Sequence, residues 1–405
     1  MVGLRFIILS ETPCEEPHAG CCGGWRLETS GYPIKSVFTY TNLLKSLKIV
    51  FSKFYQHIYT VCKYSHREVY IMYQYTSLEI CAGAGGQALG LHNAGFKHKL
   101  LIEIERVACK TLEYNNLTHS LGWENIVEGC VEYFAEHDAD KYEGIDLVAG
   151  GVPCPPFSKA GKQLGKNDER DLFPAAMKIV EKTNPKAVMI ENVSGLLDPK
   201  FDEYRDNLNL KLEELGYKTF WKLHNSSDYG VPQLRPRVTL VALKTRYAEF
   251  FKWPTNKITP PTVGEALYDL MASNGWKGAN EWKKKANKIA PTLVGGSKKH
   301  GGPDLGPSRA KRAWQELHVN GHIVGNEPPE EGFTGYKNKE GYENMPLLTV
   351  RMAARIQGFP DWWEFVGKKT PAYRQVGNAF PPPVAEHIGR AILDALKSAS
   401  CKKVA

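Results

Sequence analysis

The stretch TSLEICAGAGGQALGLHNAG, residues 76–95, decides the fold. Its first five residues predict a strand, the six glycine-rich residues after them predict a turn, and the rest predicts a helix that ends at Gly95. Glycines after a first strand let the backbone come close to a ligand at a helix N-terminus. The run is G-x-G-G, not G-x-G-x-x-G, so it is weak evidence alone. Glu103 stands 20 residues after Gly83, at the end of the next predicted strand, and is placed to hold ribose hydroxyls. Together these features favour a ligand that contains adenosine.

Strand and helix signals alternate through the following part of the chain. Strands are predicted at 100–103, 145–149, 187–190, 217–224 and 238–243, and helices at 171–184 and 203–215. This alternation predicts an α/β fold with a doubly wound, mostly parallel sheet and helices on both faces. Farther on, a capping box at 262–265 opens a short helix, residues 272–345 predict a loop-rich region, and residues 383–398 predict a helix with an apolar stripe that needs a sheet to pack on.

The composition is that of an ordinary globular protein. The chain has 405 residues, of which 42% are hydrophobic and 24% are charged, which excludes collagen, a disordered chain and a disulfide miniprotein. No apolar run approaches the roughly 18 residues of a membrane span. The net charge of +8 permits a polyanionic partner without proving one. The nine cysteines include no C-x-x-C pair and no zinc spacing, so we expect no metal site and a reducing cytosol.

Three further motifs carry reactive side chains. Two of them lie at the ends of predicted strands, where a doubly wound sheet binds its ligands, and the third precedes the strand predicted at 238–243. Cys154 lies in GVPCPPFS, residues 151–158, where prolines fix the backbone on both sides, and we interpret it as a nucleophile. Glu191 opens ENV after an apolar strand and is either a functional carboxylate or a helix cap. Arg235 and Arg237, in QLRPR, suit an anion or a planar polar group, with surface ion pairs as the plainer alternative.

The order of these motifs resembles that of the DNA (cytosine-5) methyltransferases, and most of all the single-chain prokaryotic enzymes of restriction–modification systems. Two later stretches are similar to that family as well, LTVRMAARIQGFPD at 348–361 and GNAFPPPVA at 377–385. The resemblance covers about residues 76–396. It implies a Rossmann-like methyltransferase fold, S-adenosylmethionine as cofactor and duplex DNA as substrate.

The resemblance also implies a role for each residue of the motifs. Cys154 would add to carbon 6 of a flipped-out cytosine, Glu191 would engage N3 and the exocyclic amine, Arg237 would hold the O2 side, and Arg235 would support the loop. The residues implied in cofactor binding are Cys81, Gly83, Gly85, Gly86, Glu103, Ile104, Cys130, Pro153, Leu172 and Asn378. Two departures bear on cofactor affinity: Cys81 replaces the usual phenylalanine, and Cys130 stands where an aspartate commonly accepts the adenine amine.

DNA recognition is expected mainly from the region between about residues 253 and 345. The residues implied are Ser158, Gln233, Thr292, Leu293, Lys298 and Lys299, with Arg309, Lys311 and Arg312 as further phosphate anchors or, alternatively, a solvated basic surface. The domains expected are an N-terminal non-catalytic or disordered extension (1–71), a catalytic domain (72–252), a target-recognition domain (253–346) and a segment that returns to the catalytic domain (347–405).

Two alternatives stay open beside DNA methylation. An RNA cytosine-5 methyltransferase would use the same loop on transfer RNA but would lack a sizeable recognition domain. A catalytically impaired DNA-binding relative would keep the fold, although the presence of Cys154, Glu191 and Arg237 argues against it. For the partners we expect a monomer on double-stranded DNA, a cognate restriction endonuclease acting on the same sequence, no membrane, and a cytoplasmic, nucleoid-associated location.

Overall fold

The computed structural model describes residues 75–153, 171–255, 257–296, 302, 304–335 and 340–401. All of these lie within one compact unit, residues 66–405. The predicted N-terminal extension, residues 1–71, and Cys154 with the rest of its loop lie outside the described residues.

In the described residues, seven strands form a single sheet in the order β3-β2-β1-β4-β5-β7-β6. The strands are β1 (Tyr75–Ile80), β2 (Phe96–Glu103), β3 (Ile126–Glu128), β4 (Leu147–Gly150), β5 (Ala187–Val193), β6 (Tyr217–Asn225) and β7 (Pro236–Lys244). Neighbours from β3 to β5 pair in parallel, whereas β7 is antiparallel to both β5 and β6. The predicted α/β class with a mostly parallel sheet is confirmed, and β7 is its one reversed strand among those described.

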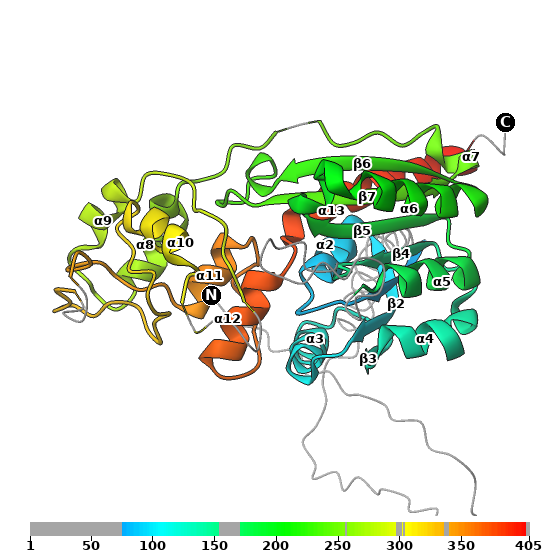
Figure 1. Cartoon of the computed structure of the whole chain (residues 1–405). Helices are drawn as coiled ribbons and strands as arrows, with labels where there is room; N and C mark the ends of the chain where they lie inside the picture. Colours follow the sequence, from blue (N-terminus) through cyan, green and yellow to red (C-terminus); the bar gives the residue numbers. More distant parts are fainter. Residues whose placement is uncertain are drawn as a thin grey trace, which may run out of the picture. The chain divides into compact units, whose positions relative to one another are not determined.

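Helices cover both faces of this sheet (Figure 1). On one face lie α4 (Val131–His137), α5 (Phe173–Thr183) and α6 (Asp202–Glu214). On the other lie α2 (Gly86–Ala94), α7 (Thr245–Ala248) and α13 (Pro382–Cys401). Strand β4 and the first part of β5 are continuous apolar runs because both of their faces are buried, which is typical of doubly wound sheets.

The last helix confirms the prediction made from its apolar stripe. Val384, Ile388, Ile392 and Leu396 of α13 are all fully buried. They pack in one cluster with residues of β4, β5 and β7, so the end of the described chain returns to the sheet. Burying each such side chain stabilises the fold by about 1.5–3 kcal/mol.

The remaining elements among the described residues are six helices and several 3-10 turns. They are α3 (Arg106–Thr118), α8 (Val263–Ala272), α9 (Ala279–Lys285), α10 (Ser308–Gln315), α11 (Val350–Ile356), α12 (Lys369–Asn378) and 3-10 turns at Ala139–Tyr142, Ser194–Leu197, Pro199–Phe201 and Ser226–Asp228. The predicted capping box of α8 is present: Thr262 Oγ1 accepts from the Glu265 N–H at 3.2 Å, and Glu265 accepts from the Thr262 N–H at 2.8 Å. Helices α3 and α4 were not predicted from the sequence.

Candidate active site

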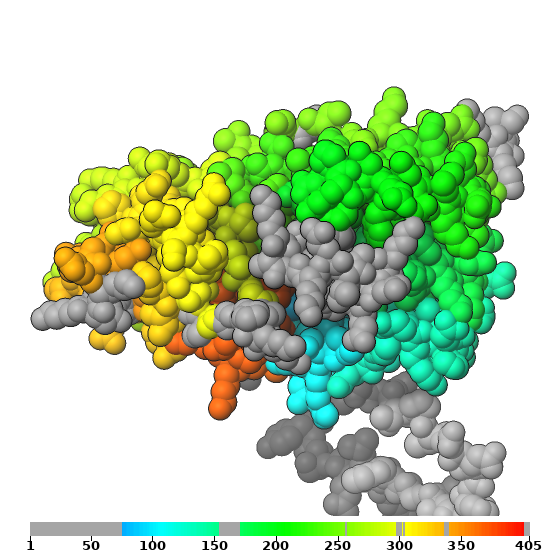
Figure 2. Space-filling model, viewed as in Figure 1, coloured from blue at the N-terminus to red at the C-terminus, as the bar shows by residue number. Residues whose placement is uncertain are grey.

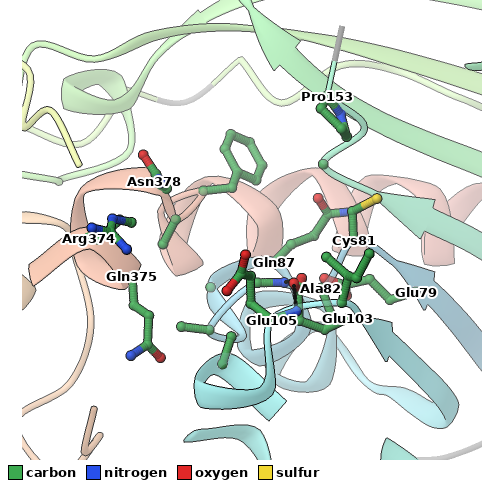
Figure 3. A pocket seen from close by; sticks show the side chains of 18 of the residues that line it. Glu79, Cys81, Ala82, Gln87, Glu103, Glu105, Pro153, Arg374, Gln375 and Asn378 are labelled. Carbon is green, nitrogen blue, oxygen red and sulfur yellow. Dashed lines mark hydrogen bonds between the residues drawn. The ribbon is translucent and has the colours of Figure 1, made fainter. Parts of the chain in front are cut away.

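A cavity of about 460 Å³ lies beyond the carboxyl ends of β1, β2, β4 and β5 (Figure 3). Its wall comes from the turn after β1, the residues that follow β2 and β4, Glu191 of β5 and, from the far end of the sequence, residues 371–380. Ligands of open α/β sheets bind at this edge. The cavity therefore stands where the sequence predicted a ligand, and it includes a segment nearly 300 residues away from the first turn.

The glycine turn and Glu103 form one side of this cavity. The Gly83 N–H donates to one carboxylate oxygen of Glu103 at 2.7 Å, and the Glu105 N–H donates to the other at 2.8 Å. Burial raises the pKa of Glu103, while these two backbone hydrogen bonds oppose the rise. Gly83 adopts φ +54°, a left-handed conformation that favours glycine. The Glu103 carboxylate is thus held in one orientation at the cavity wall.

Most of the other predicted cofactor residues also line the cavity. These are Cys81, Gly86, Ile104, Pro153, Leu172 and Asn378. A Cβ on Gly86 would lie 2.1 Å from the Phe380 carbonyl oxygen, so only glycine allows the first turn to meet the C-terminal segment there. Asn378 donates from Nδ2 to the Gly296 carbonyl at 3.2 Å.

Two predicted cofactor residues do not line the cavity. A Cβ on Gly85 would lie 2.7 Å from Leu112 Cδ2 and 2.8 Å from the Trp363 ring, so this glycine is required by packing behind the turn. Cys130 is exposed and donates its thiol to Glu132 at 2.9 Å. The next two residues, Val131 and Glu132, line the cavity in its place. The cofactor contacts predicted for Gly85 and Cys130 therefore stay predictions, which the lining of this cavity does not include.

Glu191 forms an ion pair with Arg237 across the β5–β7 strand pair. The distance from Arg237 Nε to Glu191 Oε1 is 2.8 Å, and the side chains are only 14% and 13% exposed. Burial raises the pKa of Glu191, and the positive charges of Arg237 and Arg235 oppose the rise. A Cβ on Gly151 would lie 3.3 Å from Glu191 Oε2, so the start of the Cys154 loop is adjacent to this carboxylate. Its observed partner is thus an arginine and not the helix N-terminus of the alternative interpretation.

Arg235 is not at the cavity surface but is 1% exposed. Its guanidinium donates to three backbone carbonyls, Leu293 O at 2.8 Å, Gly377 O at 2.9 Å and Ala379 O at 3.1 Å. These contacts join the start of β7 to two segments that are distant in sequence. Arg235 thus holds the backbone around the site, which is consistent with the supporting role that the resemblance implies for it.

Two residues expected to contact DNA are buried. Gln233 is fully buried, donates from Nε2 to Gln357 Oε1 at 2.7 Å and accepts from the Leu293 N–H at 2.8 Å. Leu293 is 1% exposed. Both polar ends of the Gln233 amide are therefore paired inside the protein, and neither Gln233 nor Leu293 is at the surface, so their predicted DNA contacts stay predictions. Thr292 is half-buried and donates to the Leu234 carbonyl at 2.6 Å.

The other predicted DNA contacts divide into two groups. Cys154, Ser158, Lys298 and Lys299 lie outside the described residues. Arg309 and Arg312 are exposed on α10, in the segment that is yellow in Figure 2, whereas Lys311 is half-buried and pairs with Asp304 at 2.9 Å.

The cavity also contains polar residues that the sequence analysis missed, namely Glu79, Gln87, Arg374 and Gln375. Glu79 belongs to the central strand β1, whose last four residues are all buried, so no alternation in the sequence marked it as a site residue. Among the described residues, no group of three or more His, Cys, Asp or Glu side chains could hold a metal ion. No helix in the described part of the chain combines the length and hydrophobicity that a membrane crossing requires.

Comparisons with known proteins agree with this geometry. The family model for C-5 cytosine-specific DNA methylases matches residues 75–394. The chain is 55% identical to the type II methyltransferase M.NgoMIV of Neisseria gonorrhoeae over 80% of this chain and 99% of that protein. It is 52% identical to the type II methyltransferase M.NaeI of Lentzea aerocolonigenes, over 79% and 75%. The fold is similar to the S. pombe Dnmt2 methyltransferase, with a TM-score of 0.53 at 16% identity over 80% of this chain and 99% of that one.

The motifs, the fold and the relatives lead to one assignment. The family match spans nearly all of the described residues, and both relatives are named as type II methyltransferases. The protein therefore belongs to the C-5 cytosine-specific DNA methylases, as a DNA (cytosine-5) methyltransferase of type II restriction–modification.

Proposed function

We propose that the enzyme methylates carbon 5 of one cytosine within a specific duplex sequence, through a flipped-out base and a covalent bond between Cys154 and carbon 6. The observation that carries this proposal is the Glu191–Arg237 ion pair beside Gly151 and Pro153, the residues that lead into Cys154. A carboxyl group and a guanidinium are the groups needed to bind the N3 and O2 side of a cytosine ring.

The chemistry requires the ring to become electron-rich before it can accept a methyl group. The Cys154 thiolate adds to carbon 6, and the Glu191 carboxyl donates a proton to N3, so that electron density moves to carbon 5. Burial raises the pKa of Glu191, which helps this carboxyl to carry a proton. After methylation, loss of the carbon 5 proton expels the Cys154 sulfur as thiolate, and N3 returns its proton to Glu191, which restores the neutral ring. A stacked base could not reach these groups, hence the flipped-out base.

The cavity fits S-adenosylmethionine, which when bound supplies the methyl group. The Glu103 carboxylate would hold the ribose hydroxyls, and the Gly83–Gly86 turn would lie beside the methionine part, with Leu172 and Asn378 on the wall. Its lining includes several carboxylate residues and one arginine, Arg374. This excess of acidic groups suits a ligand that carries a sulfonium and an ammonium.

DNA recognition is proposed for residues 253–346, with Thr292, Lys298 and Lys299 near the target and Arg309 and Arg312 of α10 on phosphates. The catalytic domain would be residues 72–252, completed by 347–405, and residues 1–71 would lie outside it. We propose a monomer that acts beside a cognate restriction endonuclease in the cytoplasm, at the nucleoid.

The test is transfer of labelled methyl groups from S-adenosylmethionine to duplex DNA and, in parallel, to transfer RNA, followed by mapping of the modified base. We expect one duplex sequence to be methylated. A duplex with 5-fluorocytosine at the target should trap the wild-type enzyme covalently. Carbon 5 then carries fluorine in place of the proton that must be lost before the Cys154 sulfur can leave. Cys154→Ser should abolish both reactions yet still bind DNA. Near wild-type turnover by this variant would end the assignment of the nucleophile.

A further inference from the structure

Gln87 is a buried amide without a hydrogen-bond partner on the wall of the cofactor cavity. It is the second residue of α2, directly after the glycine turn, and its side chain is 3% exposed. Neither Oε1 nor Nε2 has a partner in the described residues, and Gln87 lines the cavity (Figure 3). The same cavity is lined by Glu79, which is 1% exposed and whose Oε2 also lacks a partner.

The fold alone gives no reason for an amide at this position. An unpaired buried donor or acceptor destabilises a protein, and an apolar side chain of the same length would avoid that loss. The neighbouring residues of α2, Ala88 and Leu89, are apolar and fully buried, so an apolar side chain would suit this stretch. A ligand in the cavity that brings both an acceptor and a donor would pair the two atoms of the Gln87 amide.

We propose that Gln87 binds the amino-acid end of S-adenosylmethionine, with Nε2 donating to the carboxylate and Oε1 accepting from the ammonium. This inference rests on the proposed function of the cavity. An amide presents a donor and an acceptor side by side, which matches the two charged groups of an amino acid. Gln87 directly follows the turn assigned to the methionine part. Glu103 and Ile104 lie at the end of a different strand, β2, on the side assigned to the ribose.

The test is calorimetric binding of S-adenosylmethionine and of 5′-methylthioadenosine, which keeps the adenosine but lacks the amino-acid end. Gln87→Met preserves the length of the side chain and removes both hydrogen-bonding atoms. We expect the dissociation constant for S-adenosylmethionine to rise about 10-fold to 100-fold, since hydrogen bonds to charged groups are lost. Binding of 5′-methylthioadenosine should be unchanged, and the unfolding temperature of the unliganded variant should be no lower than that of the wild type.

Thr239→Val is the matched control, because Thr239 Oγ1 is also buried without a partner but is not part of the cavity wall. It should leave both ligands unaffected. Equal weakening of both ligands by Gln87→Met would show contact with adenine or general damage and would overturn the inference, as would unchanged binding of S-adenosylmethionine. Glu103→Gln tests the cavity separately: if it weakens S-adenosylmethionine while Gln87→Met does not, the inference fails and the proposed function stands.

Discussion

Replacing Arg235 by methionine should destabilise the protein rather than block its chemistry directly. The substitution removes three hydrogen bonds, to Leu293 O, Gly377 O and Ala379 O. Hydrogen bonds to charged groups contribute about 1.5–3 kcal/mol each. Two effects reduce the total: Ala379 O also accepts from the Gln357 amide, and the variant no longer buries a charge. We therefore expect the free energy of unfolding to fall by about 3–5 kcal/mol, the range for breaking a buried charged network.

Arg237→Met is the matched comparison, two residues along the chain. Arg237 is the side chain that pairs with Glu191 at the site. Its loss leaves a buried carboxyl group that can take up a proton, so we expect the free energy of unfolding to fall by about 1–3 kcal/mol. Its kcat should fall by about 10² to 10³, as for the loss of one donor at a reacting group. Urea unfolding followed by tryptophan fluorescence and single-turnover methylation measure the two effects separately.

The result that would refute this reasoning is specific. If Arg235→Met unfolds within about 1 kcal/mol of the wild type and yet loses as much activity as Arg237→Met, then Arg235 acts on the substrate, as the sequence alone had suggested.

Three further predictions follow from the same site. Glu191→Gln should lower kcat by about 10² to 10⁴ in single-turnover methylation, since an amide cannot donate a proton to N3; a loss below about threefold would contradict this. Glu79→Gln should be more stable than the wild type, and its advantage in free energy of unfolding should grow as the pH rises from 5 to 9. Burial raises the pKa of Glu79 well above its usual value, so the ionised form is disfavoured only in the folded state. Urea titrations across this pH range measure the advantage, and an advantage that does not change with pH would refute the prediction. Gly86→Ala should destabilise the protein by about 1–3 kcal/mol and weaken cofactor binding, because its Cβ would lie 2.1 Å from a backbone oxygen. The Cβ of Gly83→Ala would meet no atom within 4 Å, so this variant should lose only about 1–2 kcal/mol through backbone strain in the same urea assay.

The sheet could be predicted from the sequence because its signals are local. Apolar runs bounded by glycine or proline predicted six of the seven described strands. Gly95 and Gly216, both with positive φ, follow the C-terminal ends of α2 and α6 as expected. Strand β3 has three residues and carries no such signal. The buried face of helix α3 includes the polar residues Thr111 and Asn115, so its apolar periodicity is hidden in the sequence.

The site could be predicted only in part, because the roles of polar residues depend on distant partners. The motif QLRPR suggested that Gln233 and Arg235 contact a ligand, since both are polar and lie next to a strand. Their partners are backbone and amide groups 58 to 144 residues away in sequence. Nothing in the motif distinguishes them from Arg237, whose partner is a site residue. Sequence spacing identified the motif, and burial separated its members by role.

The same contacts explain why residues 293–296, within the segment proposed to recognise DNA, and the cavity cannot be structurally independent. Arg235 binds the carbonyl of Leu293 and the two carbonyls that flank Asn378. Asn378 lines the cavity and donates to Gly296, the last described residue before Lys298 and Lys299. The backbones meet so closely that a Cβ on Gly377 would lie 2.4 Å from the Gly295 nitrogen. A shift of residues 293–296 must therefore move a wall of the cavity, because close-packed backbone leaves no space to absorb it.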